Sequence, residues 1–421
     1  MTSSETQAGR RASVVTAKGL ATAAPRATRV MSYVFIIAVA AVAAQVWFAW
    51  AVEADVIGFD FEGTLWDPAV AIRNGQSPYP DAKVTEVEVG NPALYPPLFM
   101  LLVVPLTVLP EAVGSAVWIT LLGAAVAAAL ALLGVRDLRC YALAMLSAPV
   151  VSGLIWGNVA LLLIPLVALA WRWRDRWALA GLCVGLAIAA KLFLWPLGFW
   201  LLGTRRYRAA AMALASAAAG VLAPWAVIGF DGLREYPTLL RVAEQVYAVH
   251  SYSIATMLSA VGVGTETAVR LTLAVGSALA ALAFVAGRRK LDEAAISIAV
   301  VAAILGSPIV WEHYYALLLV PVAIVRPRLS WLWATFVVFY FTHGLPRPRL
   351  SASELEPGGS ACCRPPDVPS VSWVFNHAPP GLWPALANAA LGIVVGAACV
   401  VLGRRISSER GNAPSPASRS I

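Results

Sequence analysis

Residues 111–135 read EAVGSAVWITLLGAAVAAALALLGV and contain one charged side chain, Glu111. About 20 consecutive apolar residues are enough to cross the roughly 30 Å of hydrocarbon in a bilayer. A helix is the structure that satisfies the backbone polar groups of such a segment, because lipid offers no hydrogen-bonding partners. The stretch therefore predicts a transmembrane helix.

The composition of the whole chain extends this prediction. Of 421 residues, 60% are hydrophobic and 13% are charged, whereas a soluble domain has about 25% charged residues. Further long apolar runs occupy residues 31–52, 209–229, 271–287, 291–310 and 383–403. Shorter runs, which we expect to be packed inside the protein, occupy residues 141–155, 160–171, 178–190, 192–203, 314–325 and 331–343. Together they predict an all-α integral membrane protein, a polytopic bundle of roughly ten to twelve transmembrane helices.

Clusters of arginine and lysine predict the orientation, because short cytoplasmic segments retain positive charge. These clusters lie in the N-terminal tail and at 172–176, 205–208, 288–290, 326–328 and 404–405. If all of them lie in the cytoplasm, the outside loops are residues 53–97, 229–270 and 344–382. We expect the protein to lie in the plasma membrane in this orientation. Its transmembrane domain then spans 31–403, between cytoplasmic tails at 1–30 and 404–421 that we expect to be disordered. The first outside loop is acidic, which agrees with this orientation.

Several kinds of chemistry have no support in the sequence. The net charge of +8 is scattered over the cytoplasmic turns, so we expect no nucleic-acid partner. No metal-ligand spacing, phosphate-binding loop or dinucleotide-binding pattern is present, and we expect neither a metal nor a cofactor. Two adjacent cysteines, Cys362 and Cys363, lie in the third outside loop, and their role is open.

The first outside loop carries the acids that are candidates for catalysis. Asp67 and Pro68 predict the start of a short helix, with Asp67 as its N-cap. Asp60 and Glu62 precede this helix and would lie at the mouth of the bundle. Most acids in such a loop only follow the charge asymmetry. Asp60 is favoured as a general base because neighbouring Phe59 and Phe61 would partly desolvate its carboxylate.

Motifs along the chain occur in an order that resembles glycosyltransferase family 87. The motifs are Asp60-Phe61, Gly75-Gln-Ser-Pro-Tyr79, Tyr95-Pro-Pro-Leu98, Gly157-Asn158, Lys191-Leu-Phe-Leu-Trp-Pro196, Ser253-Ile254 and Ser307-Pro308 through Trp311-Glu-His313. Two of them depart from the family pattern. The segment 157–160 lacks the usual glutamine and second asparagine, and Ser251-Tyr252 replaces Asn-Gln.

The resemblance implies a fold of the GT-C class and inverting transfer of mannose from a polyprenyl-phosphate donor to a lipid or glycan acceptor at the outer face. It implies that Asp60 is the catalytic base. Lys191, His313 and Tyr95 would bind the phosphate or the sugar of the donor, and the supporting residues would be Glu62, Asn158, Ser253 and Trp311.

The residues themselves leave other interpretations open. Lys191 lies near an outer turn, where an unpaired cation is a functional candidate, but it could equally snorkel to the interface. A histidine at the end of a span, such as His313, is often only interfacial. Asp60, Lys191 and His313 could also line the path of a transporter or lipid flippase. A GT-C transferase of another sugar is the remaining alternative.

Overall fold

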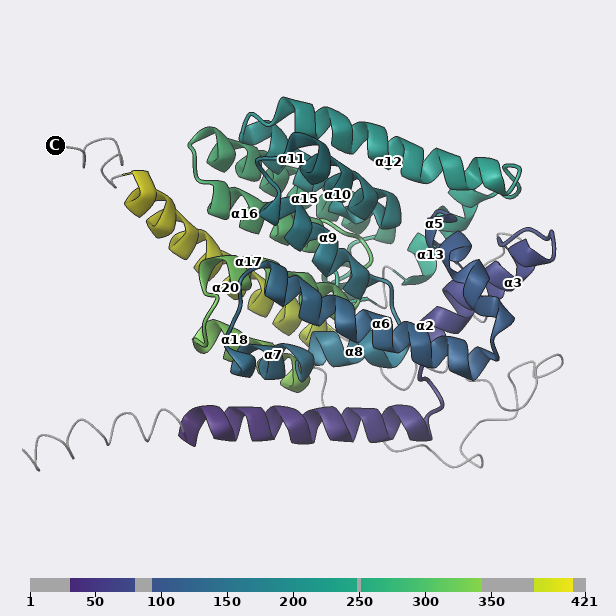
Figure 1. Cartoon of the computed structure of the whole chain (residues 1–421), viewed down its shortest axis with the longest axis horizontal. Coiled ribbons are helices and arrows are strands. Elements are labelled where there is room, and N and C mark those ends of the chain that lie inside the picture. The colour runs from purple at the N-terminus through teal and green to yellow at the C-terminus, as the bar shows by residue number, and fades with distance from the viewer. Residues whose placement is uncertain (1–30, 80–92, 248–250, 343–381, 412–421) are drawn as a thin grey trace, which may run out of the picture.

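The computed structural model describes residues 31–79, 93–247, 251–342 and 382–411, and these residues form helices and turns without a β-strand (Figure 1). Among these described residues, five helices are long and apolar enough to cross a membrane: Met31–Glu53, α6 (Glu111–Leu132), α12 (Tyr207–Val227), α15 (Thr265–Arg288) and Pro384–Ile406 within α20 (Leu382–Gly411). The all-α polytopic membrane fold is thereby confirmed.

Shorter apolar helices fill the space between the long ones. They are α5 (Leu98–Val103) with η2 (Val104–Val108), α9 (Ala160–Arg172), α10 (Trp177–Ala190), η3 (Leu192–Leu194) with α11 (Pro196–Gly203), η4 (Glu312–Leu318) with α17 (Leu319–Val325), and α18 (Trp331–Val338) with η5 (Phe339–Phe341). All of them except α5 with η2 coincide with predicted short runs. The total of ten to twelve crossings stays a prediction, because five helices, or six with one bent pair, reach spanning length among the described residues.

Two predicted spans are interrupted. The run 141–155 is a pair of helices, α7 (Leu138–Met145) and α8 (Ala148–Trp156), bent by 55°, and Pro149 in the first turn of α8 accounts for a new helix start. The run 291–310 contains the shorter helix α16 (Asp292–Leu305). This helix ends where Gly306 approaches Gly276 of α15 so closely that an added Cβ would lie 2.4 Å from a backbone atom. Pro308 then disfavours helix at the preceding residue.

Two predicted boundaries move as well. α15 begins at Thr265, inside the predicted outside loop 229–270, and Gly264 is its N-cap residue. The predicted apolar run 271–287 therefore covers only the later part of this helix. The prediction of a disordered tail from residue 404 is wrong for its first part, since α20 continues through Arg404 and Arg405 to Gly411. No helix-breaking residue occurs there before Gly411. The tail 1–30, most of the loop 344–382 with Cys362 and Cys363, and residues 412–421 lie outside the described part of the chain.

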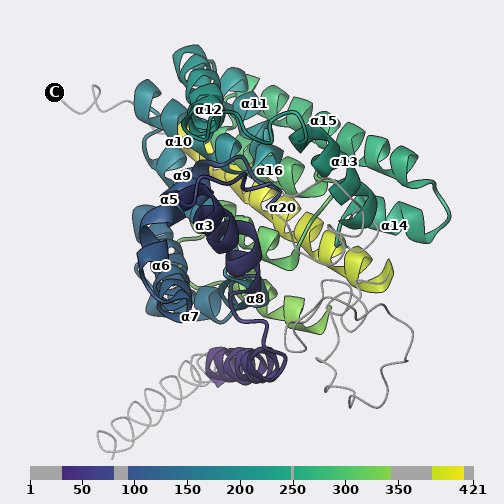
Figure 2. The ribbon, with the colours of Figure 1, turned by 90° about the vertical axis from the view of Figure 1, so that its right-hand side faces the viewer.

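The N-terminal helix Met31–Glu53 lies along one side of the bundle, somewhat apart from the other helices (Figures 1 and 2). Trp47 of this helix contacts Tyr340 of the bundle edge to face, with ring centroids 5.3 Å apart. The helix leads directly into the first outside loop, which carries Asp60 and Glu62. The short helices of this loop lie at the right-hand end of the molecule in Figure 1.

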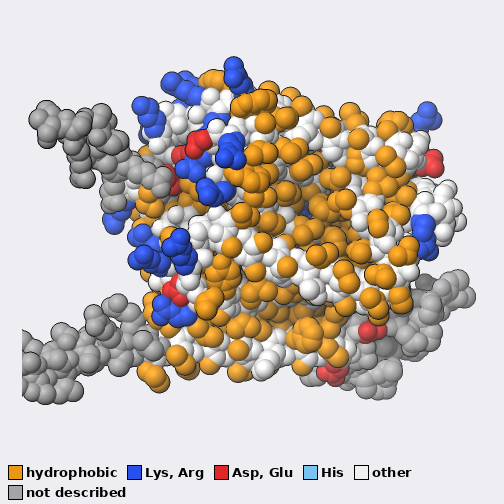
Figure 3. Space-filling model, viewed as in Figure 1, with side chains coloured by type: hydrophobic (Ala, Val, Ile, Leu, Met, Phe, Trp, Pro, Cys, Tyr) orange, Lys and Arg blue, Asp and Glu red, His pale blue; other side chains and the backbone are white. Residues whose placement is uncertain are grey.

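Basic side chains gather at the opposite end of the molecule (Figure 3). Asp292, at the start of α16, connects three predicted cytoplasmic turns at this end, those at 172–176, 205–208 and 288–290. It accepts hydrogen bonds from both terminal nitrogens of Arg206 at 3.0 and 2.8 Å and from Trp200 Nε1 at 2.6 Å, and Arg174 Nε lies 3.5 Å away. The clusters at 172–176 and 205–208 therefore meet at one end, as the charge pattern predicted.

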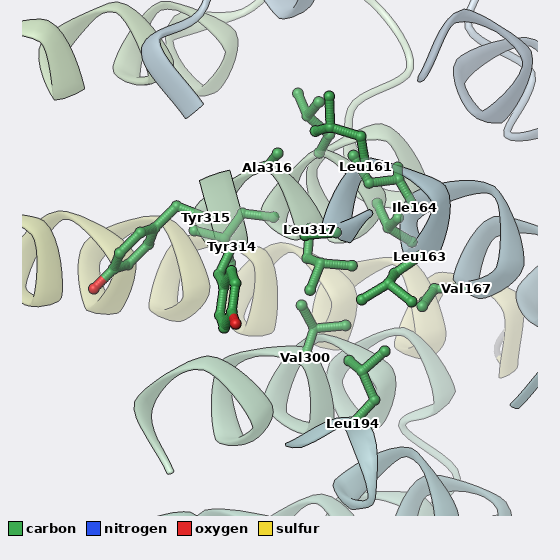
Figure 4. Packing of buried hydrophobic residues seen from close by; sticks show 14 of the residues in the cluster. Leu161, Leu163, Ile164, Val167, Leu194, Val300, Tyr314, Tyr315, Ala316 and Leu317 are labelled. Carbon is green, nitrogen blue, oxygen red and sulfur yellow. The ribbon is translucent and has the colours of Figure 1, made fainter. Parts of the chain in front are cut away.

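The centre of the bundle is packed around η4. Figure 4 shows apolar side chains of α9, among them Leu161, Leu163 and Ile164, gathered around η4 and α16. Leu317 of η4 and Val300 of α16 are labelled in the same view. Leu317 and all of these neighbours are fully buried. This packing fixes the backbone of η4, which carries His313 and Tyr314.

Candidate functional site

The loop after the N-terminal helix is itself helical. α2 (Phe59–Phe61), the π-helical η1 (Glu62–Trp66) and α3 (Asp67–Arg73) follow one another without a break. Asp67 is therefore not an N-cap: the helix already runs through Trp66, and no side-chain cap hydrogen bond forms. The start of this segment is anchored by Gly58, whose N–H donates to the carbonyl of Ile155 in α8 at 2.7 Å.

Gly157 brings the end of α8 against this segment. Its φ of +66° is in the left-handed region, and an added Cβ would lie 2.9 Å from Cβ of Phe61. Both the conformation and the space require glycine here. Trp118 Nε1 donates to the Gly157 carbonyl at 2.7 Å. The Gly157-Asn158 motif therefore places Asn158 next to Asp60, the candidate base.

Asn158 connects the predicted base with the predicted cation. Its Nδ2 donates to Oδ2 of Asp60 at 2.6 Å, and its Oδ1 accepts from Nζ of Lys191 at 3.2 Å. The N–H of Ala160 also donates to this oxygen, at 2.9 Å, and so fixes the amide. Three side chains that the sequence singled out separately therefore meet at one place.

Tyr95 joins the same cluster. The Nζ of Lys191 lies 4.8 Å from its ring centroid, within the range of a cation–π contact, and Asn158 Nδ2 lies 3.5 Å from its hydroxyl. Its backbone is held by Tyr79, whose hydroxyl donates to the Tyr95 carbonyl at 2.8 Å. Tyr79 in turn stacks on Trp225, with centroids 4.9 Å apart. The Gly-x-Ser-Pro-Tyr motif therefore supports the position of Tyr95.

His313 lies beside this cluster in η4. Its side chain is buried, and neither ring nitrogen has a hydrogen-bond partner among the described residues. A buried polar group without a partner costs free energy, so a ligand that supplies the partner would be favoured here. The ring contacts Tyr314, with centroids 5.2 Å apart. Trp311 meets Tyr247 edge to face at 6.1 Å.

The sequence pattern of glycosyltransferase family 87 matches residues 93–310, slightly more than half of the chain. The chain belongs to glycosyltransferase family 87. The resemblance stated above is therefore confirmed, and this membrane protein is a glycosyltransferase.

A curated relative extends the comparison. The family 87 chain is 27% identical over 310 residues to the polyprenol-phosphate-mannose-dependent alpha-(1-2)-phosphatidylinositol pentamannoside mannosyltransferase of Mycolicibacterium smegmatis. The alignment covers 69% of this chain and 70% of the relative. A comparison with solved structures gave no significant match.

Glu62 lies apart from the Asn158 cluster of this family 87 enzyme. Burial, together with the nearby acids Glu111, Asp67 and Asp55, raises the pKa of its carboxyl to about 7. Its Oε1 and the buried hydroxyl of Ser115 in α6 lie 3.3 and 3.6 Å from the position that a Cβ on Gly58 would occupy. The supporting role of Glu62 stays a prediction, and the structure groups it with other acids.

Ser253 has a structural task at the start of α14 (Ile254–Ala260). Its hydroxyl accepts a hydrogen bond from the N–H of Thr256 at 3.1 Å, as an N-cap does. A role toward substrate stays a prediction for this residue of the family 87 chain. In the described part of the chain, no three His, Cys, Asp or Glu side chains are grouped so that they could hold a metal ion.

Sequence reasoning missed Tyr314 in the family 87 site. Its hydroxyl accepts a hydrogen bond from Nζ of Lys191 at 2.9 Å. The one signal in the sequence was its position directly after His313, and that position alone did not distinguish it from Tyr315.

Proposed function

We propose that this family 87 glycosyltransferase transfers mannose from a polyprenyl-phosphate donor to a lipid or glycan acceptor with inversion at the anomeric carbon. The observation that carries the proposal is the Asn158 side chain, which holds the carboxylate of Asp60 and the ammonium of Lys191 through its two ends. A base and a cation are the two groups that transfer from a phosphate leaving group needs. The name of the mycolicibacterial relative, a polyprenol-phosphate-mannose-dependent mannosyltransferase, supports mannose and a polyprenol-phosphate carrier.

In the proposed reaction, Asp60 removes the proton from the acceptor hydroxyl. The acceptor oxygen then bonds to the anomeric carbon while the bond from that carbon to the donor phosphate oxygen breaks. The electron pair of the broken bond remains on the phosphate, which needs no proton at neutral pH. Lys191 stabilises the negative charge that the phosphate gains in this step.

His313 and Tyr95 complete the proposed donor site. The ring nitrogens of His313, which have no hydrogen-bond partner among the described residues, can exchange hydrogen bonds with a sugar hydroxyl or a phosphate oxygen. The Tyr95 hydroxyl lies within reach of the same Asn158 amide that holds the base. Trp311 offers an aromatic surface next to this region, and such surfaces suit sugar rings and polyprenyl chains alike.

The identity of the sugar is tested by a transfer assay. The purified protein is incubated with a native lipid extract and with polyprenyl-phosphate mannose, glucose or arabinose in parallel. We expect a mannosylated product in the mass spectrum with the mannose donor alone. A product that forms only with glucose or arabinose would contradict mannose as the substrate and would retain the enzyme class.

We further propose that both termini are cytoplasmic and that the site opens to the outer face of the plasma membrane. Gln76 is exposed in the loop that carries Asp60, and Arg289 is exposed at the opposite, basic end. In a variant without native cysteines, Gln76→Cys should react with an impermeant maleimide in intact cells. Arg289→Cys is the matched control and should react only after permeabilisation. The reverse pattern would invert the orientation.

A further inference from the structure

The ammonium of Lys191 is buried, and the side chains that contact it directly are neutral. The residue is 4% exposed and forms the C-terminal cap of α10. Its hydrogen bonds go to Oδ1 of Asn158 and to the hydroxyl of Tyr314, and its Nζ lies over the rings of Tyr95 and Tyr314 at 4.8 and 4.2 Å. Within the described part of the chain it forms no ion pair.

This environment leaves hydrogen-bonding capacity of the ammonium available. A lysine ammonium has three N–H donors, and two of them are used by Asn158 and Tyr314. Oriented neutral acceptors and aromatic faces stabilise the cation. One N–H donor therefore remains for an incoming anion.

Tyr314 is itself firmly held. Its ring stacks on Phe193 of η3 with centroids 4.8 Å apart and an interplanar angle of 9°, and it meets the edge of His313. The residue is 7% exposed, so little of the ring is left to stack on a substrate. Its hydroxyl, in contrast, has a defined task, because it accepts from Lys191.

We propose that Tyr314 is a positioning residue that orients the Lys191 ammonium, so that the third N–H of the ammonium points to the phosphate of the donor. This inference rests on the proposed function, in which Lys191 binds that phosphate. Phe193 contributes by fixing the Tyr314 ring through stacking. Neither residue contacts the reacting atoms, and both act through Lys191.

The test compares Tyr314→Phe in the parent and in a Lys191→Met background. The phenylalanine keeps the ring and loses the hydrogen-bond acceptor. We expect the KM for polyprenyl-phosphate mannose to rise about tenfold in the parent background, the effect of losing one hydrogen bond to a charged group, with the KM for acceptor unchanged. In the Lys191→Met background the same substitution should have no further effect on donor KM. If Tyr314→Phe raises donor KM by the same factor in both backgrounds, the role of Tyr314 is merely structural and the inference is overturned.

Tyr315→Phe is the matched control, because Tyr315 is buried in the same element and its hydroxyl lies 3.5 Å from the carbonyl of Tyr252, away from Lys191. We expect the donor KM of this variant to equal that of the parent. Phe193→Leu gives a second measurement if Tyr314→Phe does not fold, since it loosens the stack and leaves the hydroxyl. It should raise donor KM in the parent and not in the Lys191→Met background, and a rise in both would overturn the inference.

Failure of this inference is distinguishable from failure of the proposed function. If Lys191→Met leaves donor KM at the parent value, the phosphate role of Lys191 is wrong. If Lys191→Met raises donor KM and Tyr314→Phe does not, the phosphate role stands and the positioning role of Tyr314 is wrong.

Discussion

Replacement of Asp60 by asparagine is expected to lower the rate of mannosyl transfer by about 10²- to 10⁴-fold, the range typical of a lost general base. The amide has the shape of the carboxylate and still accepts the hydrogen bond from Nδ2 of Asn158, which is 2.6 Å long in the parent. It cannot accept the proton of the acceptor hydroxyl. Single-turnover transfer with saturating donor and acceptor measures the chemical step directly, and donor affinity should stay within about twofold.

Asp67→Asn is the matched control for this experiment. Asp67 is an acid of the same loop, and it is exposed and lies in α3, so the same chemical change is made outside the Asn158 cluster. We expect its turnover to match the parent. Parent-level turnover of Asp60→Asn would remove Asp60 from the role of base and would leave Glu62 as the next acid to test.

The sequence predicted the fold class because membrane helices obey simple rules of length and hydrophobicity. Runs such as 111–135 and 209–229 are apolar on all sides, and α6 and α12 occupy nearly the same residues. The places where the prediction was wrong are local. The helix α16 ends before Gly306 and Pro308, whose effect on helix formation the apolar run 291–310 did not take into account. The close approach of Gly306 to Gly276 in another helix was not visible in the sequence.

The members of the site were easier to predict than their arrangement. Asp60 stood out because neighbouring Phe59 and Phe61 would partly desolvate its carboxylate, and Lys191 because an unpaired cation near a membrane is costly. Asn158 was expected only as a supporting residue, although it links the two. The conformation of Gly157 and its contact with Phe61 create that link, and such a contact between distant segments becomes visible only in the folded chain. For the same reason Tyr314 could not be separated from Tyr315.

Replacement of Lys191 by methionine is expected to weaken binding of the polyprenyl-phosphate donor by about ten- to a hundredfold, the equivalent of roughly 1.5 to 3 kcal/mol for a charge-assisted contact. Methionine preserves the apolar stem and removes the charge. Asn158 should remain in place, because its Oδ1 still accepts from the N–H of Ala160 at 2.9 Å. The carboxylate of Asp60 therefore keeps its hydrogen bond, and the loss is confined to the donor phosphate.

The measurement that identifies this loss is the affinity for polyprenyl-phosphate mannose relative to the uncharged polyprenol. The parent should prefer the phosphorylated lipid, and Lys191→Met should lose most of that preference while it binds polyprenol as the parent does. Arg241→Met is the matched control, since Arg241 is an exposed cation of α13 (Tyr236–Tyr247) whose Nη2 donates to Thr238 Oγ1 at 3.0 Å. Its preference should equal that of the parent. Retention of the full preference in Lys191→Met would make Lys191 a structural cation and would leave the buried ring of His313 as the next candidate for the phosphate.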